Sequence, residues 1–422
     1  MSEPRVTRME VDIERILPGG MGLAHAEGKT VFVPLAAPGD RVRVRVEREQ
    51  GNVLFASIEE VVTPSPLRIE PPCPYFGRCG GCDFQQLTYE TQLAAKADII
   101  RDCLHRIARL ENVPEIVVTP SPNDWRYRWR ATWQIDRELQ QVGYYERGSR
   151  RVCDVADCAV LKPELQLTLE QVRATGWNEF PHDLKHLDAV AGENGVSLSP
   201  PFAQFETNEL SLTVRGEVYN YNAGTFFQIN PSLLAPLVEF ALGDAAGETA
   251  LDLYCGVGLF TLPLSRRFQK VVGVETNAAA ARFARRNLQR AELTNASVTT
   301  ATVTDWFRSG ARGPVDFVLL DPPRAGAESA VIRAILNVKP AQISYVSCDP
   351  ATLARDLRKL IAGGYSIHSV LAFDLFPQTH HVETVVRLHV NYDDNESSQK
   401  LDKSVSSRTT IRGPGRGHLR TK

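Results

Sequence analysis

The chain has 422 residues, is 43% hydrophobic and 23% charged, and carries a formal net charge of −2 at pH 7. Its length predicts two or three domains, and its composition is typical of a soluble globular protein. Because it contains neither an apolar stretch long enough to span a bilayer nor the layout of a signal peptide, we expect a cytoplasmic protein with no membrane partner, whose eight cysteines form no structural disulfides.

Residues 6–64 alternate strand and turn signals. In RVRVRV, residues 41–46, valines occupy one face of the expected strand and arginines the other, so the valines face a core and the arginines face out. Several short strands in this region predict a small OB-like barrel. The order GGMGLA…VFVPLAAPGDRVRV resembles the TRAM domain, an RNA-binding barrel, although outward arginines by themselves are more often a solvated face.

The region 65–225 contains three closely spaced cysteines in CPYFGRCGGCDFQQ. Cys73, Cys79 and Cys82 are improbable as packing residues at this spacing, and the glycine pair before the last of them lets the backbone wrap closely around a metal centre. We therefore predict metal ligation, with zinc and an iron–sulfur cluster both open on spacing alone. The fourth ligand would be Cys153 or Cys158, in RRVCDVADCAVL.

Two other stretches of this region predict secondary structure. TYETQLAAKADIIRDCLHRIARL, near residues 88–110, has apolar residues at helical spacing, which makes Cys103 a packing residue and the helix a candidate to pack on the last domain. DWRYRWRATW, residues 124–133, interleaves arginines with aromatic residues. We interpret it as an amphipathic strand with most of the aromatics inside, the alternative being a surface that stacks bases and holds phosphates.

Residues 226–394 alternate strands and helices, which predicts a doubly wound parallel sheet whose ligands bind at the carboxyl ends of the strands. The first such end, DLYCGVG, has a turn with Gly256 and Gly258, and Glu275 ends the next strand about twenty residues later. A carboxylate there accepts hydrogen bonds from a ribose diol. A nicotinamide site would prefer a third glycine near Phe260, so this set instead resembles the S-adenosylmethionine site of class I methyltransferases.

The next two strand ends carry Asp321, in DPPR, and Cys348, in ISYVSCDPATLARDL. The prolines stiffen the loop after Asp321 and aim its carboxylate into the cleft. Asp349 is a good helix cap and Pro350 fits a first helical turn, so Cys348 lies just before a helix N-terminus. That position lowers the pKa of a thiol, although the charge of Asp349 works against this. The alternative is a small apolar residue that only packs.

The last strand begins at Glu383, in FDLFPQTHHVETVVRL, and we interpret the nearby His380 and His381 as hydrogen-bonded structure. A methyl donor, a thiol and a carboxylate at neighbouring strand ends suit one reaction. Carbon 5 of a pyrimidine becomes nucleophilic enough to accept a methyl group when a thiolate adds at carbon 6, and a base must then remove the carbon-5 proton so that the thiolate can leave. This makes Cys348 a candidate nucleophile.

Taken in order, the motifs resemble those of the bacterial uridine-5-methyltransferases of 23S ribosomal RNA, from about residue 8 to 392. Behind the TRAM-like barrel they are CPYFGRCGGCDFQQ, FFQIN, DLYCGVG, LDPPRAG, SYVSCDPATLARDL and FPQTHHVE. The resemblance implies a class I methyltransferase sheet (Rossmann-like), an N-terminal OB-like TRAM barrel and a central α+β domain with an iron–sulfur cluster. It also implies these roles: Cys348 as nucleophile and Glu383 as general base; Gln228, Tyr254, Gly256, Gly258, Glu275 and Asp321 at the S-adenosylmethionine site; Cys73, Cys79, Cys82 and Cys158 as ligands of a 4Fe-4S cluster.

Under this resemblance Cys153 becomes a bystander. Leu259 stands where the family often has asparagine, which puts one polar contact to the methyl donor in doubt. The resemblance further predicts a monomeric cytoplasmic enzyme. It favours 23S ribosomal RNA as the substrate, because tRNA-specific relatives commonly lack both the barrel and the cysteine cluster.

Three alternatives differ in substrate or in kind: a tRNA uridine-5-methyltransferase, an RNA cytosine-5-methyltransferase, and a non-enzymatic RNA-binding protein on an inactive methyltransferase fold. The presence of both Cys348 and Glu383 disfavours the last of these. Beyond the three domains, the residues from Asn395 carry seven Lys or Arg against two acids and predict a disordered basic tail, residues 395–422.

Overall fold

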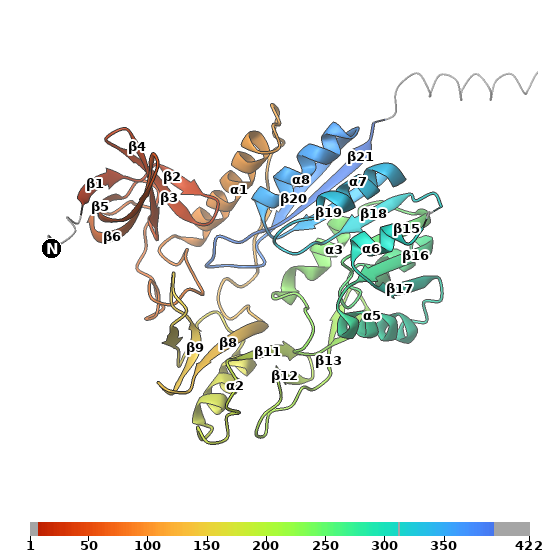
Figure 1. Ribbon diagram of the computed structural model, residues 1–422, viewed down its shortest axis with the longest axis horizontal. Helices are drawn as coiled ribbons and strands as arrows, with labels where there is room; N and C mark the ends of the chain where they lie inside the picture. Colours follow the sequence, from red (N-terminus) through yellow and green to blue (C-terminus); the bar gives the residue numbers. More distant parts are fainter. Residues whose placement is uncertain (1–6, 311–312, 392–422) are drawn as a thin grey trace, which may run out of the picture.

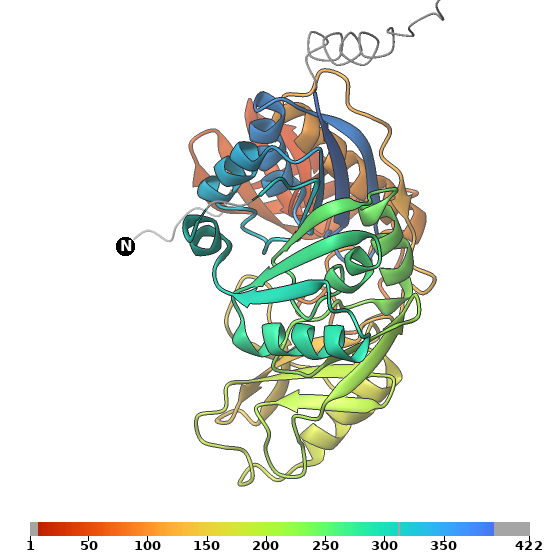
Figure 2. The ribbon, with the colours of Figure 1, turned by 90° about the vertical axis from the view of Figure 1, so that its right-hand side faces the viewer.

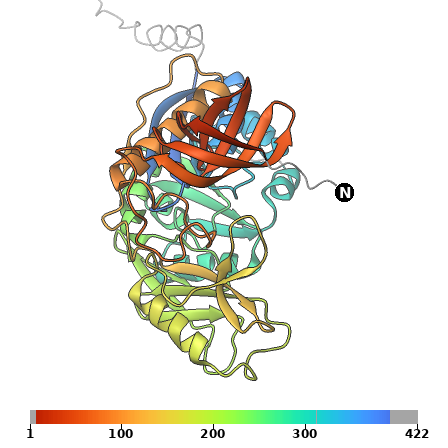
Figure 3. The same ribbon diagram turned by 90° about the vertical axis from the view of Figure 1, so that its left-hand side faces the viewer.

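The computed structural model describes residues 7–310 and 313–391. They form an N-terminal barrel-like sheet, a central sheet, a two-stranded hairpin and a large sheet flanked by helices (Figure 1). Figure 3 shows the N-terminal sheet and the central sheet at opposite ends of the molecule. No helix in the described ranges is both long and apolar enough to cross a membrane. The predicted tail, residues 395–422, lies outside the described residues.

The N-terminal sheet has six strands in the order β1-β5-β6-β4-β3-β2. Val42 and Val44 are fully buried, as the alternation of RVRVRV predicts. The arginines of the same strand face out and pair with carboxylates. Arg43, for example, pairs with both Glu10 and Glu60. This face of the barrel is therefore largely neutralised by its own acids. The strands are β1 (Arg8–Asp12), β2 (Arg15–Leu17), β3 (Met21–Ala26), β4 (Lys29–Pro34), β5 (Arg41–Gln50) and β6 (Val53–Thr63).

The central sheet has five antiparallel strands in the order β10-β9-β8-β11-β12, with α2 packed on it. The strand predicted in DWRYRWRATW begins only at Arg130, because Arg126 has a left-handed backbone with φ of 55°. Tyr127 is buried, but Trp125 and Trp129 are only half-buried, so the prediction of one long amphipathic strand is wrong for its first half. The elements are β8 (Arg130–Asp136), β9 (Gln141–Tyr145), β10 (Val152–Asp154), α2 (Pro163–Ala174), β11 (His186–Gly192) and β12 (Gly195–Ser199), followed by the hairpin β13 (Leu210–Val214) and β14 (Glu217–Tyr221).

Residues ahead of the central sheet contribute to the large sheet. The predicted helix forms as α1 (Tyr89–Arg106) and packs against α8 (Pro350–Ala362), with Cys103 buried in the shared core. The short strand β7 (Val118–Thr119) then pairs with β20 (Tyr365–Phe373) at one end of the large sheet. One edge strand of the large sheet thus comes from residues that precede the central sheet in the chain.

The large sheet has the strand order β17-β16-β15-β18-β19-β21-β20-β7. The order reverses between β15 and β18, and in such a sheet the reversal opens a crevice at the carboxyl ends of the strands. The first five strands are parallel, as predicted, but β21 is antiparallel to both of its neighbours. The connection before it, residues 374–382, is too short for a parallel crossover. The strands are β15 (Gly247–Leu253), β16 (Phe268–Glu275), β17 (Ala296–Thr300), β18 (Phe317–Leu320), β19 (Gln342–Ser347) and β21 (Glu383–Val390).

Helices cover both faces of the large sheet, as Figure 2 shows. Along β18, Phe317 and Leu319 join the core on one face, whereas Val318 and Leu320 join the core on the other. A strand buried on both faces needs such an unbroken apolar run. One face carries α3 (Leu234–Leu242), α4 (Thr261–Ser265) and α5 (Ala278–Arg290), and the other carries α1, α6 (Val303–Arg308), α7 (Ser329–Val338) and α8.

Candidate functional site

A cleft of about 720 Å³ opens at the carboxyl edge of the large sheet. Glu383 reaches this edge because β21 is antiparallel, so its first residue lies beside the last residues of the other strands. Gly258 does not line the cleft: its backbone φ is 97°, and a side chain there would meet Leu262 and Ala284. The other residues predicted for the catalytic and methyl-donor site all line it: Gln228, Tyr254, Gly256, Glu275, Asp321, Cys348 and Glu383.

Glu275 closes the glycine turn at the end of β15. One of its carboxylate oxygens accepts a hydrogen bond from the Gly256 N–H at 2.9 Å, and the other accepts one from the Asn277 N–H at 2.6 Å. Gly256 has a φ of 55°, which glycine adopts without strain. Since each carboxylate oxygen has a further lone pair, Glu275 can hold the turn and still accept hydrogen bonds from a ribose diol.

Three carboxyl groups lie at this edge of the sheet: Asp252 and Glu383 are buried, and Asp321 is half-buried. Burial raises the pKa of Asp252 to about 7 and the pKa of Asp321 to about 7. Burial also raises the pKa of Glu383 well above its usual range, and the charge of Asp321 adds to that effect. The Oε1 atom of Glu383 has no hydrogen-bond partner among the described residues. A carboxyl group with a raised pKa is, in its ionised form, a stronger proton acceptor, which suits a general base.

Cys348 follows β19 immediately and precedes the cap of α8. Asp349 accepts a hydrogen bond from the Thr352 N–H at 2.8 Å, and Pro350 begins the helix, which confirms the predicted strand-to-helix junction. This places the Cys348 sulfur in the cleft wall, half-buried, at the end of the strand next to β18.

The low thiol pKa predicted for this position is wrong. Burial raises the pKa of Cys348 to about 12, and the charge of Glu383 adds to the effect, while Arg324 opposes it. Burial and facing carboxylates therefore outweigh the helix N-terminus. The thiol is protonated at neutral pH, so it must lose its proton before it can act as a nucleophile.

The cleft also contains residues that the sequence did not single out. Arg324 lines it, and its positive charge opposes the rise in pKa of both Cys348 and Glu383. Phe226 is 62% exposed at the cleft, with the Arg130 guanidinium 5.9 Å from its ring centroid. The motifs LDPPRAG and FFQIN contained two of these residues, but only the fold shows that their side chains reach the same space.

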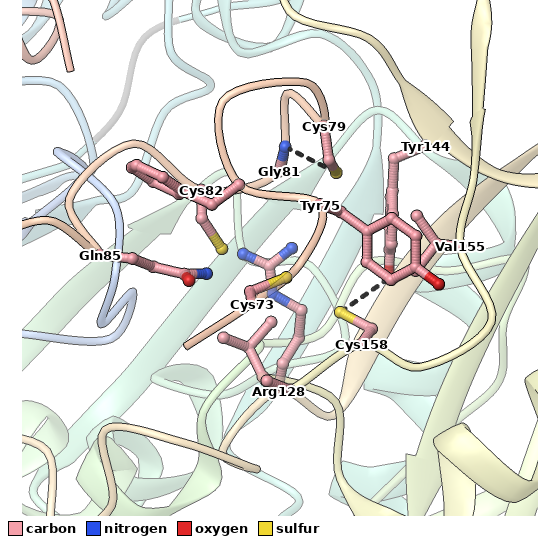
Figure 4. A pocket seen from close by; sticks show the side chains of 13 residues that line it. Cys73, Tyr75, Cys79, Gly81, Cys82, Gln85, Arg128, Tyr144, Val155 and Cys158 are labelled. Carbon is pink, nitrogen blue, oxygen red and sulfur yellow. Dashed lines mark hydrogen bonds between the residues drawn. The ribbon is translucent and has the colours of Figure 1, made fainter. Parts of the chain in front are cut away.

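A second cavity gathers four cysteines (Figure 4). Gly80 lets the loop approach β9 closely, because a side chain there would lie 3.0 Å from the Tyr145 carbonyl oxygen. Burial raises the pKa of Cys79 to about 11 and that of Cys82 to about 12. Arg128 and Gln85 also line the cavity, and the four cysteines are Cys73, Cys79, Cys82 and Cys158. Cys153 does not line it, and its sulfur accepts a hydrogen bond from the Arg78 Nε at 3.2 Å.

Arg128 makes this cavity suitable for an anionic group. Its Nε is buried and has no hydrogen-bond partner among the described residues, and Cys82 and Cys158 are among the groups that interact with its charge. A cation in a buried cavity is unfavourable without compensating negative charge, and thiolates that bind a metal supply such charge. Within the described ranges, no three His, Cys, Asp or Glu side chains lie close enough together to hold a single metal ion. The four thiols and the buried cation fit a thiolate–metal centre by their chemistry.

Sequence comparisons place the chain among known enzymes. Residues 202–308 and 312–391 match the tRNA (Uracil-5-)-methyltransferase family, and residues 9–67 match the TRAM domain of tRNA (uracil(54)-C(5))-methyltransferase. An uncharacterized RNA methyltransferase of Gloeobacter violaceus is 34% identical over 439 residues, which cover 90% of this chain and 95% of the relative. The 23S rRNA (uracil(1939)-C(5))-methyltransferase RlmD of Vibrio parahaemolyticus is 31% identical over 417 residues, which cover 89% of this chain and 94% of the relative. The chain belongs to the RNA (uracil-5-)-methyltransferase family.

The methyltransferase is also similar to a solved structure, the Pyrococcus abyssi tRNA (uracil-54, C5)-methyltransferase in complex with S-adenosyl-L-homocysteine. The two share 26% identity with a TM-score of 0.70, over 90% of this chain and 100% of that one. This likeness and the TRAM match confirm the predicted class I methyltransferase fold with an N-terminal TRAM domain. The matching TRAM domain is that of a tRNA enzyme, so the barrel alone does not distinguish between ribosomal RNA and tRNA as the substrate.

Proposed function

We propose that this methyltransferase transfers a methyl group from S-adenosylmethionine to carbon 5 of a uridine in 23S ribosomal RNA. The observation that carries the proposal is the convergence of Cys348, Glu383 and the Glu275 turn on one cleft. The 31% identity to the Vibrio parahaemolyticus enzyme supports 23S ribosomal RNA as the substrate. The similarity to the Pyrococcus abyssi enzyme makes a tRNA uridine the second candidate.

In the proposed mechanism the half-buried Cys348 thiol gives its proton to solvent in the cleft, and the resulting thiolate adds to carbon 6 of the uracil. Electrons from the carbon 5–carbon 6 double bond reach carbon 5, which then takes the methyl group from the sulfonium. Glu383 removes the carbon-5 proton, the double bond re-forms and the thiolate leaves. The raised pKa of Glu383 suits this step, and the positive charge of Arg324 favours both the thiolate and the carboxylate.

Mapping of 5-methyluridine in total RNA tests the substrate. A strain that lacks the gene should lose the modification at one or more positions of 23S ribosomal RNA, and the purified enzyme should restore it on RNA from that strain. Loss of 5-methyluridine from tRNA alone would select the second candidate. Labelled methyl found in cytosine, with none in uracil, would contradict both.

The methyl-donor site is tested at Glu275. Replacing Glu275 by alanine removes the proposed acceptor for the ribose diol and releases the Gly256 and Asn277 N–H groups. S-adenosylmethionine affinity should fall about ten- to a hundredfold, with RNA affinity nearly unchanged, as expected for the loss of hydrogen bonds to a charged group. Calorimetric titration of each ligand measures both values. The control is Glu239→Ala, which removes an exposed carboxylate on α3 that pairs with Arg215. Unaltered S-adenosylmethionine affinity in Glu275→Ala would show that Glu275 is not part of the site.

We further propose that Cys73, Cys79, Cys82 and Cys158 hold a 4Fe-4S cluster. Four thiols around one cavity with a buried guanidinium support this assignment, and the position of Cys153 outside the cavity favours Cys158 as the fourth ligand. Such a cluster would supply a rigid covalent link between the loop at residues 73–86 and the central sheet. Methyl transfer moves no net electrons, so we assign the cluster a structural or RNA-positioning role.

Metal analysis tests the cluster. Protein purified without oxygen should be brown and contain about four irons, whereas stoichiometric zinc without visible absorbance would contradict the assignment. Cys158→Ser should release the iron and Cys153→Ser should retain it. These two residues lie on the same segment, so they form a matched pair. The reverse outcome would make Cys153 the fourth ligand.

A further inference from the structure

The segment that leads into Glu383, residues 374–382, is held by the cysteine-bearing loop. We call these two stretches the base segment (residues 374–382) and the cluster loop (residues 73–86). The backbone N–H groups of Asp83 and Phe84 both donate to the Gln378 carbonyl oxygen at 3.1 Å. Cluster-loop backbone therefore bonds directly to the backbone of the base segment.

Asp83 makes the most direct side-chain link between the two stretches. One of its carboxylate oxygens accepts a hydrogen bond from the His380 N–H at 2.8 Å, and the other bonds to the His380 Nδ1 at 2.5 Å. Asp83 follows Cys82, one of the proposed cluster ligands. The barrel meets the same point, because a side chain at Gly20 would lie 3.0 Å from the His380 Cβ. Three parts of the chain thus converge on His380.

Helix α1 secures the first half of the same segment. Gln92 and Gln378 exchange two hydrogen bonds of 2.9 Å each. The Lys96 ammonium pairs with Asp374 at 2.5 Å, with both side chains fully buried, and also donates to the Phe376 carbonyl oxygen at 3.1 Å. A buried pair with extra hydrogen bonds fixes geometry strongly, since breaking it leaves a buried charge unpaired.

The base segment ends in the cleft. Phe376 and Glu383 both line it. Because the Oε1 atom of Glu383 has no hydrogen-bond partner among the described residues, the position of this carboxyl group depends on its backbone, which is set by the pairing of β21 with β20 and by the segment that precedes it. A general base must lie within hydrogen-bond reach of the proton that it removes, so a shift of about 1 Å in that backbone is enough to slow the step.

We propose that Asp83 is a positioning residue for methyl transfer: through His380 it ties the cluster loop to the base segment, so that the metal centre holds Glu383 in place for proton removal. This inference rests on the proposed function, in which Glu383 acts as the base and the four cysteines bind a metal centre. It assigns the centre a mechanical part in catalysis that needs no change of its oxidation state.

The test compares Asp83→Ala with Asp157→Ala in the metal-loaded protein. Both aspartates adjoin a proposed cluster ligand, but Asp157 is exposed and pairs with Arg126, away from the base segment. Asp83→Ala should speed backbone hydrogen exchange in residues 374–382 about tenfold, in line with the loss of one or two buried hydrogen bonds. It should also build up a covalent RNA–protein adduct that carries labelled methyl, with S-adenosylmethionine affinity unchanged. Asp157→Ala should change none of these, and Asp83→Asn, which keeps an acceptor oxygen, should recover most of the wild-type behaviour.

The His380→Ala variant and metal-free wild-type protein test the same link independently. If Asp83→Ala loses its metal, His380→Ala breaks the same link from outside the cluster loop and should give the same exchange and adduct results. Wild-type protein stripped of metal should show the same faster exchange in residues 374–382. Unchanged exchange together with free product at the wild-type rate would overturn the positioning role. If the wild-type protein itself forms no 5-methyluridine in RNA, the proposed function has failed, while the exchange measurement still decides the mechanical link.

Discussion

Replacing Glu383 by glutamine is expected to trap the reaction as methylated RNA covalently bound to Cys348. Glutamine has the size of glutamate but is not a useful base at neutral pH, so addition at carbon 6 and methyl transfer can proceed while removal of the carbon-5 proton fails. Glu383 is buried with a raised pKa and an unpartnered oxygen, so a neutral amide of the same shape should be accommodated without loss of the fold.

Denaturing gel electrophoresis with labelled S-adenosylmethionine measures this outcome. The adduct should appear as a slowly migrating band that carries the methyl label and disappears after ribonuclease treatment. Glu239→Gln, on the exposed side of α3, should turn over normally and give no such band. Release of free 5-methyluridine at the wild-type rate by Glu383→Gln would show that another residue is the base, with Asp321 the next candidate because burial raises its pKa to about 7 in the same cleft.

The alternation of strands and helices in the last domain was predictable because its local patterns agree with its tertiary structure. The segment around Cys348 illustrates this: an apolar strand, an aspartate cap and a proline in the first turn all predict the same junction, and the structure forms it. Glu275 could be paired with the glycine turn for the same reason, since the strand-turn-helix spacing sets both positions. Where several local signals agree, the secondary structure and the positions of the site residues at its ends can be predicted from the sequence.

The electrostatics of the site could not be predicted in this way. The local rule at Cys348, a helix N-terminus, favours a thiolate, yet burial in the cleft wall raises its pKa, and carboxyl groups of β21 and of the loop after β18 add to the effect. The antiparallel direction of β21 likewise brings Glu383 to the edge where the parallel strands end. Arg128 was interpreted as part of an amphipathic strand but faces the cysteines. Each of these depends on contacts between segments far apart in sequence.

Cys348→Ala should abolish both adduct formation and methyl transfer while it leaves ligand binding intact. Without a nucleophile at carbon 6, carbon 5 of uracil stays too unreactive toward the methyl donor, and we expect the single-turnover rate to fall by at least about four orders of magnitude. The thiol is half-buried in the cleft wall rather than in either apolar core, so its removal should cost less than about 1 kcal/mol of stability. S-adenosylmethionine affinity should stay within about twofold, since the site retains Glu275 and the glycine turn.

Cys255 provides the matched control for this substitution. It lines the same cleft, from the glycine turn, and burial raises its pKa well above the usual range. Its backbone N–H is held by the Val274 carbonyl oxygen, and its sulfur packs next to Gly273, so its placement is that of a core residue. Cys255→Ala should therefore keep methyl transfer, and Cys255→Ala combined with Glu383→Gln should still form the adduct, whereas Cys348→Ala combined with Glu383→Gln should not. Methyl transfer that survives in Cys348→Ala and is lost in Cys255→Ala would identify Cys255 as the nucleophile and contradict the role assigned to Cys348.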